Sequence, residues 1–134
     1  MKLPPPFDER PFWLQVAGGI VVPMVFGIVT GFVLSWNEIG YYVLAGPIAI
    51  AGGFLGGVEH RESGEGFLRG AVGGLIFGSF ILLGNEMLDP DETKAHLPDP
   101  QAGLVFVTTI GGAILGALGA RWRNRQERRE ALSG

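Results

Sequence analysis

The sequence predicts an all-α, polytopic membrane protein: four transmembrane helices packed through small-residue (GxxxG) stripes. The first observation is composition, because the 134 residues are 47% hydrophobic and only 17% charged, with 23 glycines. Soluble domains carry about 25% charge and about 7% glycine. The second observation is that charged residues divide the chain into four long apolar stretches, and the third is a glycine spacing of four within them. The length predicts a single integral membrane domain, residues 1–134.

The predicted helices cover about 12–36, 39–58, 66–86 and 102–120, and residues 121–134 form a basic tail. A helix needs roughly 20 apolar residues to cross about 30 Å of hydrocarbon, and each stretch is close to that length or longer. The first stretch is too long for the apolar region of a secretory signal, and "MKLPPPFDERP" is a poor start for one, so we interpret it as a retained helix. Pro23 and Pro47 are expected to kink the first two helices.

The orientation follows from the basic residues. With four crossings, the two termini and the central loop lie on one side of the membrane. That side holds nine of the ten basic residues, namely Lys2, Arg10, Arg61, Arg69, Arg121, Arg123, Arg125, Arg128 and Arg129. Only Lys94 lies on the other side. The positive-inside rule then predicts a cell-membrane protein with both termini in the cytoplasm. Trp13 and Trp122 are expected at the inner interface, and Trp36, Tyr41 and Tyr42 at the outer one.

The glycine pattern allows two interpretations. "GEGFLRG" is close to the dinucleotide motif G-x-G-x-x-G, but it has one residue too many and no strand is predicted before it. Spacing of four instead places residues on one helix face, and small residues let helix backbones approach closely in lipid. We therefore predict helix packing through Gly19, Gly27, Gly31, Gly53, Gly57, Gly66, Gly70, Gly74, Gly78, Gly112 and Gly116. The short link "EHRESGE" makes helices two and three an antiparallel hairpin, in which Gly53 and Gly57 are expected near Gly66 and Gly70 as the closest helix contact.

Three arginines are candidates for contact with a lipid or another anion: Arg69, Arg121 and Arg123. For Arg69 the alternative is an i, i+4 pair with Glu65, with the side chain extending to the inner interface. The basic run "RWRNRQERRE" has the charge to bind nucleic acid. A basic run beside a membrane helix normally faces anionic lipid, so the bilayer is the expected partner and nucleic acid is not.

No metal, cofactor or catalytic set is expected. His60 stands alone among carboxylates, whereas a metal site needs three or four converging ligands. The acidic loop with His96, Asp89, Asp91, Glu92 and Asp99 is a weaker alternative, a site for a hard cation. The chain has no cysteine, and no nucleophile, base and acid stand at a recognisable spacing. The deep hydroxyls are Thr30, Ser79, Thr108 and Thr109, and we expect them to bond to their own helices.

The stretch "AGGFLGGVEHRESGEGFLRGAVGGLIFGS" resembles a group of small prokaryotic membrane proteins of unknown function, which have four glycine-rich helices and a short polar hairpin. The expected function is therefore a non-enzymatic structural or accessory one. The chain is expected to form a homo-oligomer or to serve as a subunit of a membrane complex, because four glycine faces exceed what one small bundle needs. The alternative is an oligomeric channel or small-solute transporter, and an enzyme comes third.

Overall fold

The computed structural model describes residues 2–88 and 102–134, and within these residues all regular structure is helical. The elements are η1 (Phe7–Glu9), α1 (Phe12–Val16), the π-helical turn η2 (Ala17–Val21), α2 (Val22–Trp36), α3 (Glu38–Val58), α4 (Ser63–Leu88) and α5 (Ala102–Ser133). Four helices are long and apolar enough to cross a membrane: Phe12–Leu34, Glu38–Val58, Ser63–Met87 and Ala102–Ser133. The predicted all-helical class with four such helices is therefore confirmed.

Prolines and one asparagine determine where the first helices begin and end. Pro11 directly precedes α1, and η2 and α2 continue it without a break. Pro23 has no N–H to donate to the carbonyl four residues earlier, and the π-helical turn lies directly before α2, which carries this proline in its first turn. Asn37 ends α2 and caps α3, because its Oδ1 accepts a hydrogen bond from the Gly40 N–H at 2.9 Å.

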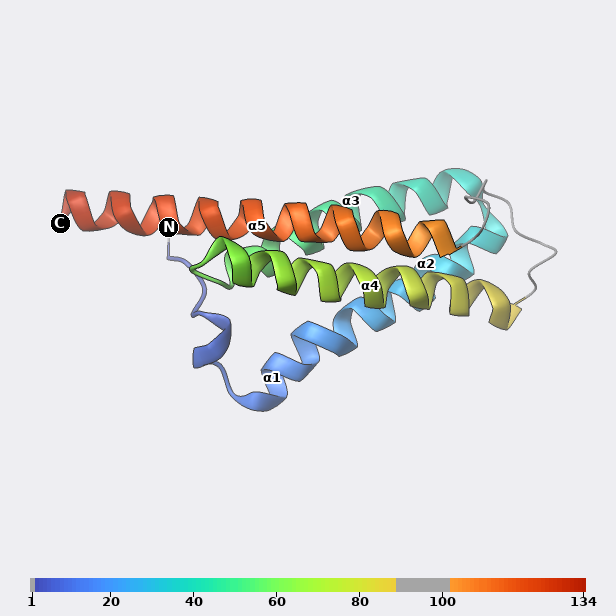
Figure 1. The fold of residues 1–134 in the computed structure, drawn as a ribbon. Helices are drawn as coiled ribbons and strands as arrows, with labels where there is room; N and C mark the ends of the chain where they lie inside the picture. Colours follow the sequence, from blue (N-terminus) through green and yellow to red (C-terminus); the bar gives the residue numbers. More distant parts are fainter. Residues whose placement is uncertain (1, 89–101) are drawn as a thin grey trace.

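The helices are arranged around the α4–α5 pair. Figure 1 shows α4 and α5 side by side, with α2 crossing α4 diagonally. On the other side of the pair, α3 packs mainly against α5. Both chain ends lie at the end of the bundle where α3 passes into α4, and α5 projects beyond the bundle there (Figure 1). The residues predicted as a tail after residue 120 are thus a continuation of α5.

The predicted glycines of α4 lie against α5. A Cβ added at Gly70 would collide with the Gly112 carbonyl, and one at Gly74 with the Thr108 carbonyl. A Cβ at Gly66 would collide with the carbonyl of Gly116 in the same way. In α2, a Cβ at Gly27 would lie 2.7 Å from the Phe77 carbonyl oxygen, and one at Gly31 would collide with that of Ile81. The backbones approach so closely at these points that only glycine fits without a shift.

The expectation that α3 and α4 make the closest helix contact is wrong, because α4 packs most extensively against α5. Gly57 of α3 faces the carbonyl of Gly116 in α5, which is the same carbonyl that Gly66 of α4 faces. Gly53 lies against Leu115 of α5. The reason is Arg69, whose guanidinium Cζ would lie 3.6 Å from a Cβ at Gly56 and thus occupies the space between α3 and α4.

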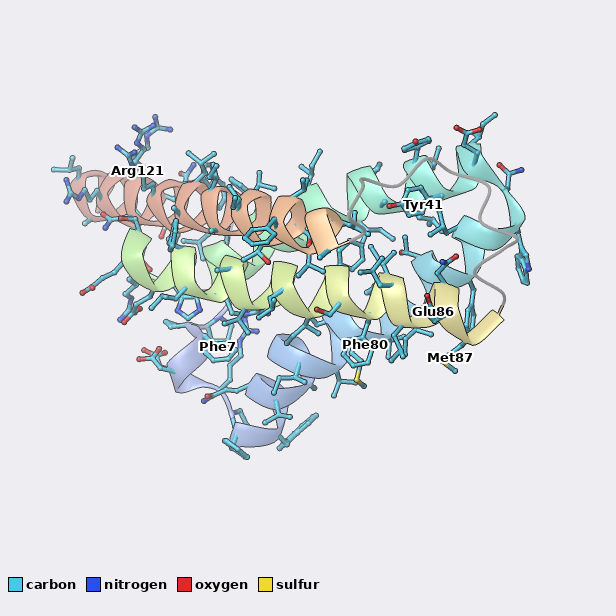
Figure 2. The ribbon with its side chains drawn as sticks, turned by 45° about the vertical axis from the view of Figure 1, so that its right-hand side comes forward. Phe7, Tyr41, Phe80, Glu86, Met87 and Arg121 are labelled. Carbon is cyan, nitrogen blue, oxygen red and sulfur yellow. The ribbon has the colours of Figure 1, made fainter. Side chains whose placement is uncertain are left out.

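Two other expectations also need correction. Gly19 does not face another membrane-length helix, since the nearest atom to a Cβ there is Phe7 Cζ at 3.8 Å. Tyr41, for which an interfacial position is expected, is buried within the bundle: it is 4% exposed and belongs to the core with Leu34, Phe77, Ile81 and Leu104. Figure 2 shows Tyr41 on α3 above the start of α5. Trp13 and Trp36 are exposed on the surface, at 67% and 72%.

Candidate functional site

Charged side chains gather at one end of the bundle, which we call the polar end. It comprises the α3–α4 link (residues 59–62), the N-terminal segment before α1 (residues 2–11) and the first turns of α4, and α5 continues past it. The Phe7 N–H donates to the Glu59 carbonyl at 2.9 Å, which fastens the N-terminal segment to the link. In Figure 2, Phe7 lies beside the beginning of α4. Segments distant in sequence thus meet here.

Arg69 is the central residue of the polar end. Its side chain is only 13% exposed. Its NH2 group donates to the Gly18 carbonyl at 2.8 Å, and its Nε lies 3.8 Å from Glu59 Oε2. The Phe7 ring covers the guanidinium, with 5.8 Å from Cζ to the ring centroid. The expected pair with Glu65 is not formed, because Arg69 turns into the bundle and Glu65 faces His60.

Glu59 is shared by two arginines. Arg10 NH1 bonds to Glu59 Oε1 at 2.7 Å, and Arg10 also donates to the Pro5 carbonyl through Nε and NH2. Arg69 approaches the other carboxylate oxygen, Oε2, which has no hydrogen-bond partner. Two guanidiniums and one carboxylate (+2 and −1) leave this cluster with a net charge of +1. A positive charge at such a depth attracts an anion more strongly than it would in water.

His60 lies beside this cluster and is 14% exposed. Its ring stacks at a tilt on Phe7, with centroids 5.2 Å apart, and its Nδ1 is 3.6 Å from Glu65 Oε2. Burial lowers the pKa of His60, the Glu65 carboxylate raises it in opposition, and Arg69 lowers it further. The balance favours the neutral imidazole at neutral pH. Among the described residues, no three His, Cys, Asp or Glu side chains are grouped as a metal would require.

The other two candidate arginines differ sharply. Arg123 is 3% exposed, and its NH1 donates to the carbonyls of Pro4 and Val58, both at 2.9 Å. Its Nε bonds to Glu127 at 2.9 Å. Arg123 therefore joins α5 to the N-terminal segment and to the end of α3. Its buried, hydrogen-bonded position does not fit the predicted contact with a lipid or another anion. Arg121 is exposed and points away from the bundle (Figure 2).

A cavity of about 750 Å³ begins at the Arg69–Glu59 pair and extends between α2, α3, α4 and α5. Along α3 its lining runs from Glu59 to Tyr41, about 27 Å at about 1.5 Å per residue. Most of the lining is glycine, alanine and aliphatic side chains, and Glu59 and Arg69 are its charged residues. A Cβ at Gly46, Gly52 or Gly111, which line it, would meet nothing within 4 Å. The cavity is thus apolar along its length and charged at one end.

The deep threonine hydroxyls already donate hydrogen bonds to carbonyls of their own helices, so they offer few free polar groups to this cavity. Thr30 donates to the Phe26 carbonyl at 2.7 Å, and Thr109 to that of Val105 at 2.6 Å. Thr108, which lines the cavity, donates to the carbonyls of Leu104 and Val105, both at 3.1 Å. The expected bonding of these three threonines to their own helices is confirmed. The acidic loop with His96 lies outside the described residues.

Sequence reasoning missed Glu59 as the partner of Arg69, and it missed Arg10. A signal was present, because Glu59 begins the short link and Arg69 lies in the second turn of α4, so the antiparallel hairpin brings the two residues near one another. Gly56 and Gly73, which make room for the Arg69 guanidinium, were also missed. They lie beside the predicted stripes, so a search for a spacing of four passes over them.

We found no family model, curated protein or solved structure that matches this chain. The resemblance to small four-helix membrane proteins stays a prediction.

Proposed function

We propose that this chain is a non-enzymatic protein of the cell membrane, of structural or accessory type, that acts within a homo-oligomer or as a subunit of a larger membrane complex. Four helices cross the bilayer and pack through small-residue stripes, and both termini lie in the cytoplasm. The membrane placement is supported by the four long apolar helices and by their surface, where large hydrophobic side chains such as Val25, Ile50, Val72 and Ile114 are exposed. Such surfaces are stable when lipid covers them.

The proposal of an accessory role rests on the projecting part of α5. Residues 121–133 continue the helix for about 20 Å, and the part after Glu127, which still contacts Arg61 of the link, projects past the bundle. Arg123 anchors this extension by its bonds to Pro4 and Val58, so it stands as a rigid arm rather than a free tail. Arg121, Arg125, Arg128 and Arg129 are exposed on it. A helix that is polar on all sides and leaves its own domain commonly bridges to another one.

The glycine stripes themselves support self-association less than the sequence suggested. Gly27, Gly31, Gly57, Gly66, Gly70, Gly74, Gly78, Gly112 and Gly116 all face atoms of other helices in the same chain. A partner therefore contacts other surfaces, and the α5 extension offers the most distinct one among the described residues.

The first test is topology, followed by assembly. A reporter fused after Gly134 is expected to be cytoplasmic and one inserted near Thr93 external; a cytoplasmic Thr93 reporter contradicts the four-crossing proposal.

For assembly, the full chain is chemically cross-linked in its own membrane and compared with the variant Arg125→Gln/Arg128→Gln/Arg129→Gln. We expect cross-linked species larger than the monomer, and their loss in the variant. Lys2→Gln, which removes an exposed basic residue of the N-terminal segment, is the control and keeps them. Monomer alone in the wild type contradicts the proposal.

The alternative is a channel or small-solute transporter, and the cavity of about 750 Å³ is the observation that favours it. A conduction path needs polar groups that replace the hydration of the solute. Beyond Glu59 and Arg69 the cavity lining is mainly apolar, and the Thr108 hydroxyl on it is already bonded to its own helix. The accessory role is therefore preferred, and liposome flux decides between the two.

A further inference from the structure

We infer that the cavity between α2, α3, α4 and α5 binds one anionic phospholipid, with an acyl chain along the glycine-lined cavity and the phosphate at Arg69. This inference rests on the membrane placement proposed above and goes beyond it, because it assigns a ligand to a site inside the bundle. Ligand cavities of about 300–1,000 Å³, mostly apolar with a few placed polar groups, are typical of specific binding sites. This cavity falls within that range at about 750 Å³.

The shape of the cavity fits an amphiphile. Its charged residues, Glu59 and Arg69, lie at the polar end, and its lining reaches Tyr41 about 27 Å away along α3. The apolar part lies at membrane depth, since Tyr41 and Glu59 stand near the two ends of a helix long enough to cross the bilayer. A molecule that fills it must therefore have one charged end and one long apolar part.

The unused hydrogen-bond donors of Arg69 indicate that the charged end of the ligand is negative. Among the described residues, the Gly18 carbonyl is the one acceptor within hydrogen-bond distance of its guanidinium. Its Nε is buried without a hydrogen-bond partner, and Glu59 Oε2 is too far away at 3.8 Å. Arginine carries five N–H donors in a planar fork that matches the oxygens of a phosphate. The guanidinium thus has donors to spare where it borders the cavity.

The neighbouring carboxylate does not cancel this charge. Glu59 is neutralised by Arg10 at 2.7 Å, and the cluster of Arg10, Glu59 and Arg69 retains a net charge of +1. Of the other charged groups at the polar end, Arg61 lies 3.7 Å from Glu9 and 3.5 Å from Glu127, and the Glu65 carboxylate faces His60 at 3.6 Å and not Arg69. Charge complementarity therefore favours an anionic headgroup over a zwitterionic one.

A second copy of the chain is a less suitable occupant. The open glycines Gly46, Gly52 and Gly111 would accept a helix, but a membrane helix of this chain would bring large side chains against a cavity that ends in a charged pair. A lipid supplies the anionic group and the apolar chain in one molecule, and the bilayer offers it from the side.

The test uses full-length protein in a non-ionic detergent and counts bound lipids by native mass spectrometry. The probes are phosphatidylglycerol and phosphatidylcholine with identical acyl chains. We expect the wild type to retain one phosphatidylglycerol in preference to phosphatidylcholine. Arg69→Gln should lower phosphatidylglycerol retention about tenfold, because hydrogen bonds to charged groups contribute about 1.5–3 kcal/mol. Lys2→Gln removes a positive charge from an exposed site outside the cavity and should leave retention unchanged.

The cavity itself is tested by filling it. Gly52→Leu adds a large side chain to the lining of the cavity and leaves Arg69 untouched, so it should lower the retention of both lipids severalfold. Gly64→Leu, also an open position but outside the cavity, is its control. Phosphatidylglycerol bound equally well by wild type, Arg69→Gln and Gly52→Leu overturns the inference. So does displacement of the lipid by inorganic phosphate alone, which indicates a simple anion site. A loss of oligomer in Gly52→Leu without a loss of lipid assigns the cavity to a second copy and also overturns it.

The proposed function fails separately from this inference. If the Thr93 reporter is external but the protein binds neither lipid, the lipid site is overturned and the membrane placement is not. A cytoplasmic Thr93 reporter overturns the membrane placement, and the inference with it.

Discussion

At the scale of single residues, buried arginines organise the polar end. The side chains of Arg69 and Arg123 are 13% and 4% exposed, and both donate hydrogen bonds to backbone carbonyls of distant segments. A buried guanidinium is costly unless it is paired and hydrogen-bonded, so these two positions require the segments around them to be in place. Arg123 meets that requirement through Nε and NH1, whereas the Nε of Arg69 has no hydrogen-bond partner.

His60 provides a prediction about pH at this scale. Its pKa is lowered in the folded protein by burial, from an ordinary value of about 6.5. The unfolded chain then binds the proton more readily, so the stabilisation from neutral His60 is full above about pH 6.5 and is lost as pH falls toward the folded pKa. We expect the melting temperature of the wild type in detergent to fall from about pH 7 to about pH 5 more steeply than that of His60→Gln.

The comparison with His60→Gln isolates the imidazole. The neighbours that face it are Phe7, Glu59, Glu65 and Arg69. They are the same in both proteins, so their own titration cancels in the difference between the two melting curves at each pH. Parallel pH dependences of the two proteins would show that His60 does not titrate between the folded and unfolded states.

At the scale of elements, α5 is the helix on which the others converge. Gly112 and Gly116 allow α4 to approach it, Gly116 also faces Gly57 of α3, and Gly119 faces the Phe54 carbonyl. Glycine and alanine on more than one side therefore let α5 contact two helices closely at once. In lipid, such close contacts replace the hydrophobic effect as the source of helix association.

Gly70→Leu tests this element. Its side chain would meet the Gly112 backbone, so α4 and α5 must separate, and overpacking of this kind costs about 1–3 kcal/mol. We expect a clear drop in the melting temperature in detergent. Gly64→Leu on the same helix, where nothing lies within 4 Å of a Cβ, should cost much less. Equal melting temperatures for Gly70→Leu and the wild type would contradict close packing of α4 on α5.

At the scale of the whole molecule, the bundle has a cavity but no continuous polar path among its described residues. The charged groups on the cavity lie at the polar end, and Tyr41 lies near the opposite end of α3. Between them the lining is mainly glycine and aliphatic side chains. This distribution suits a bound apolar chain better than a hydrated ion.

The corresponding prediction replaces all four deep hydroxyls together. Changing Thr30, Thr108 and Thr109 to Val and Ser79 to Ala removes groups of which the three threonines bond to their own backbone. We expect the wild type to pass no potassium in a liposome flux assay, and the variant to assemble as the wild type does. A wild type that conducts, together with a variant that does not, would replace the accessory function by the channel.

The sequence alone determined the number of long helices, their approximate ends and most of the glycines of close approach. Apolar length and small-residue spacing are local properties, so Phe12–Trp36 and the Gly66–Gly78 stripe could be recognised without knowledge of their neighbours. The tertiary structure decided which helix each stripe meets. A short link makes α3 and α4 antiparallel, but the Arg69 guanidinium beside Gly56 lies between them, and both stripes turn to Gly116 of α5. Burial and pairing of Arg69, Glu59 and Arg123 depend on residues 49 to 119 positions away, or on a helix rotation, and no local pattern encodes either.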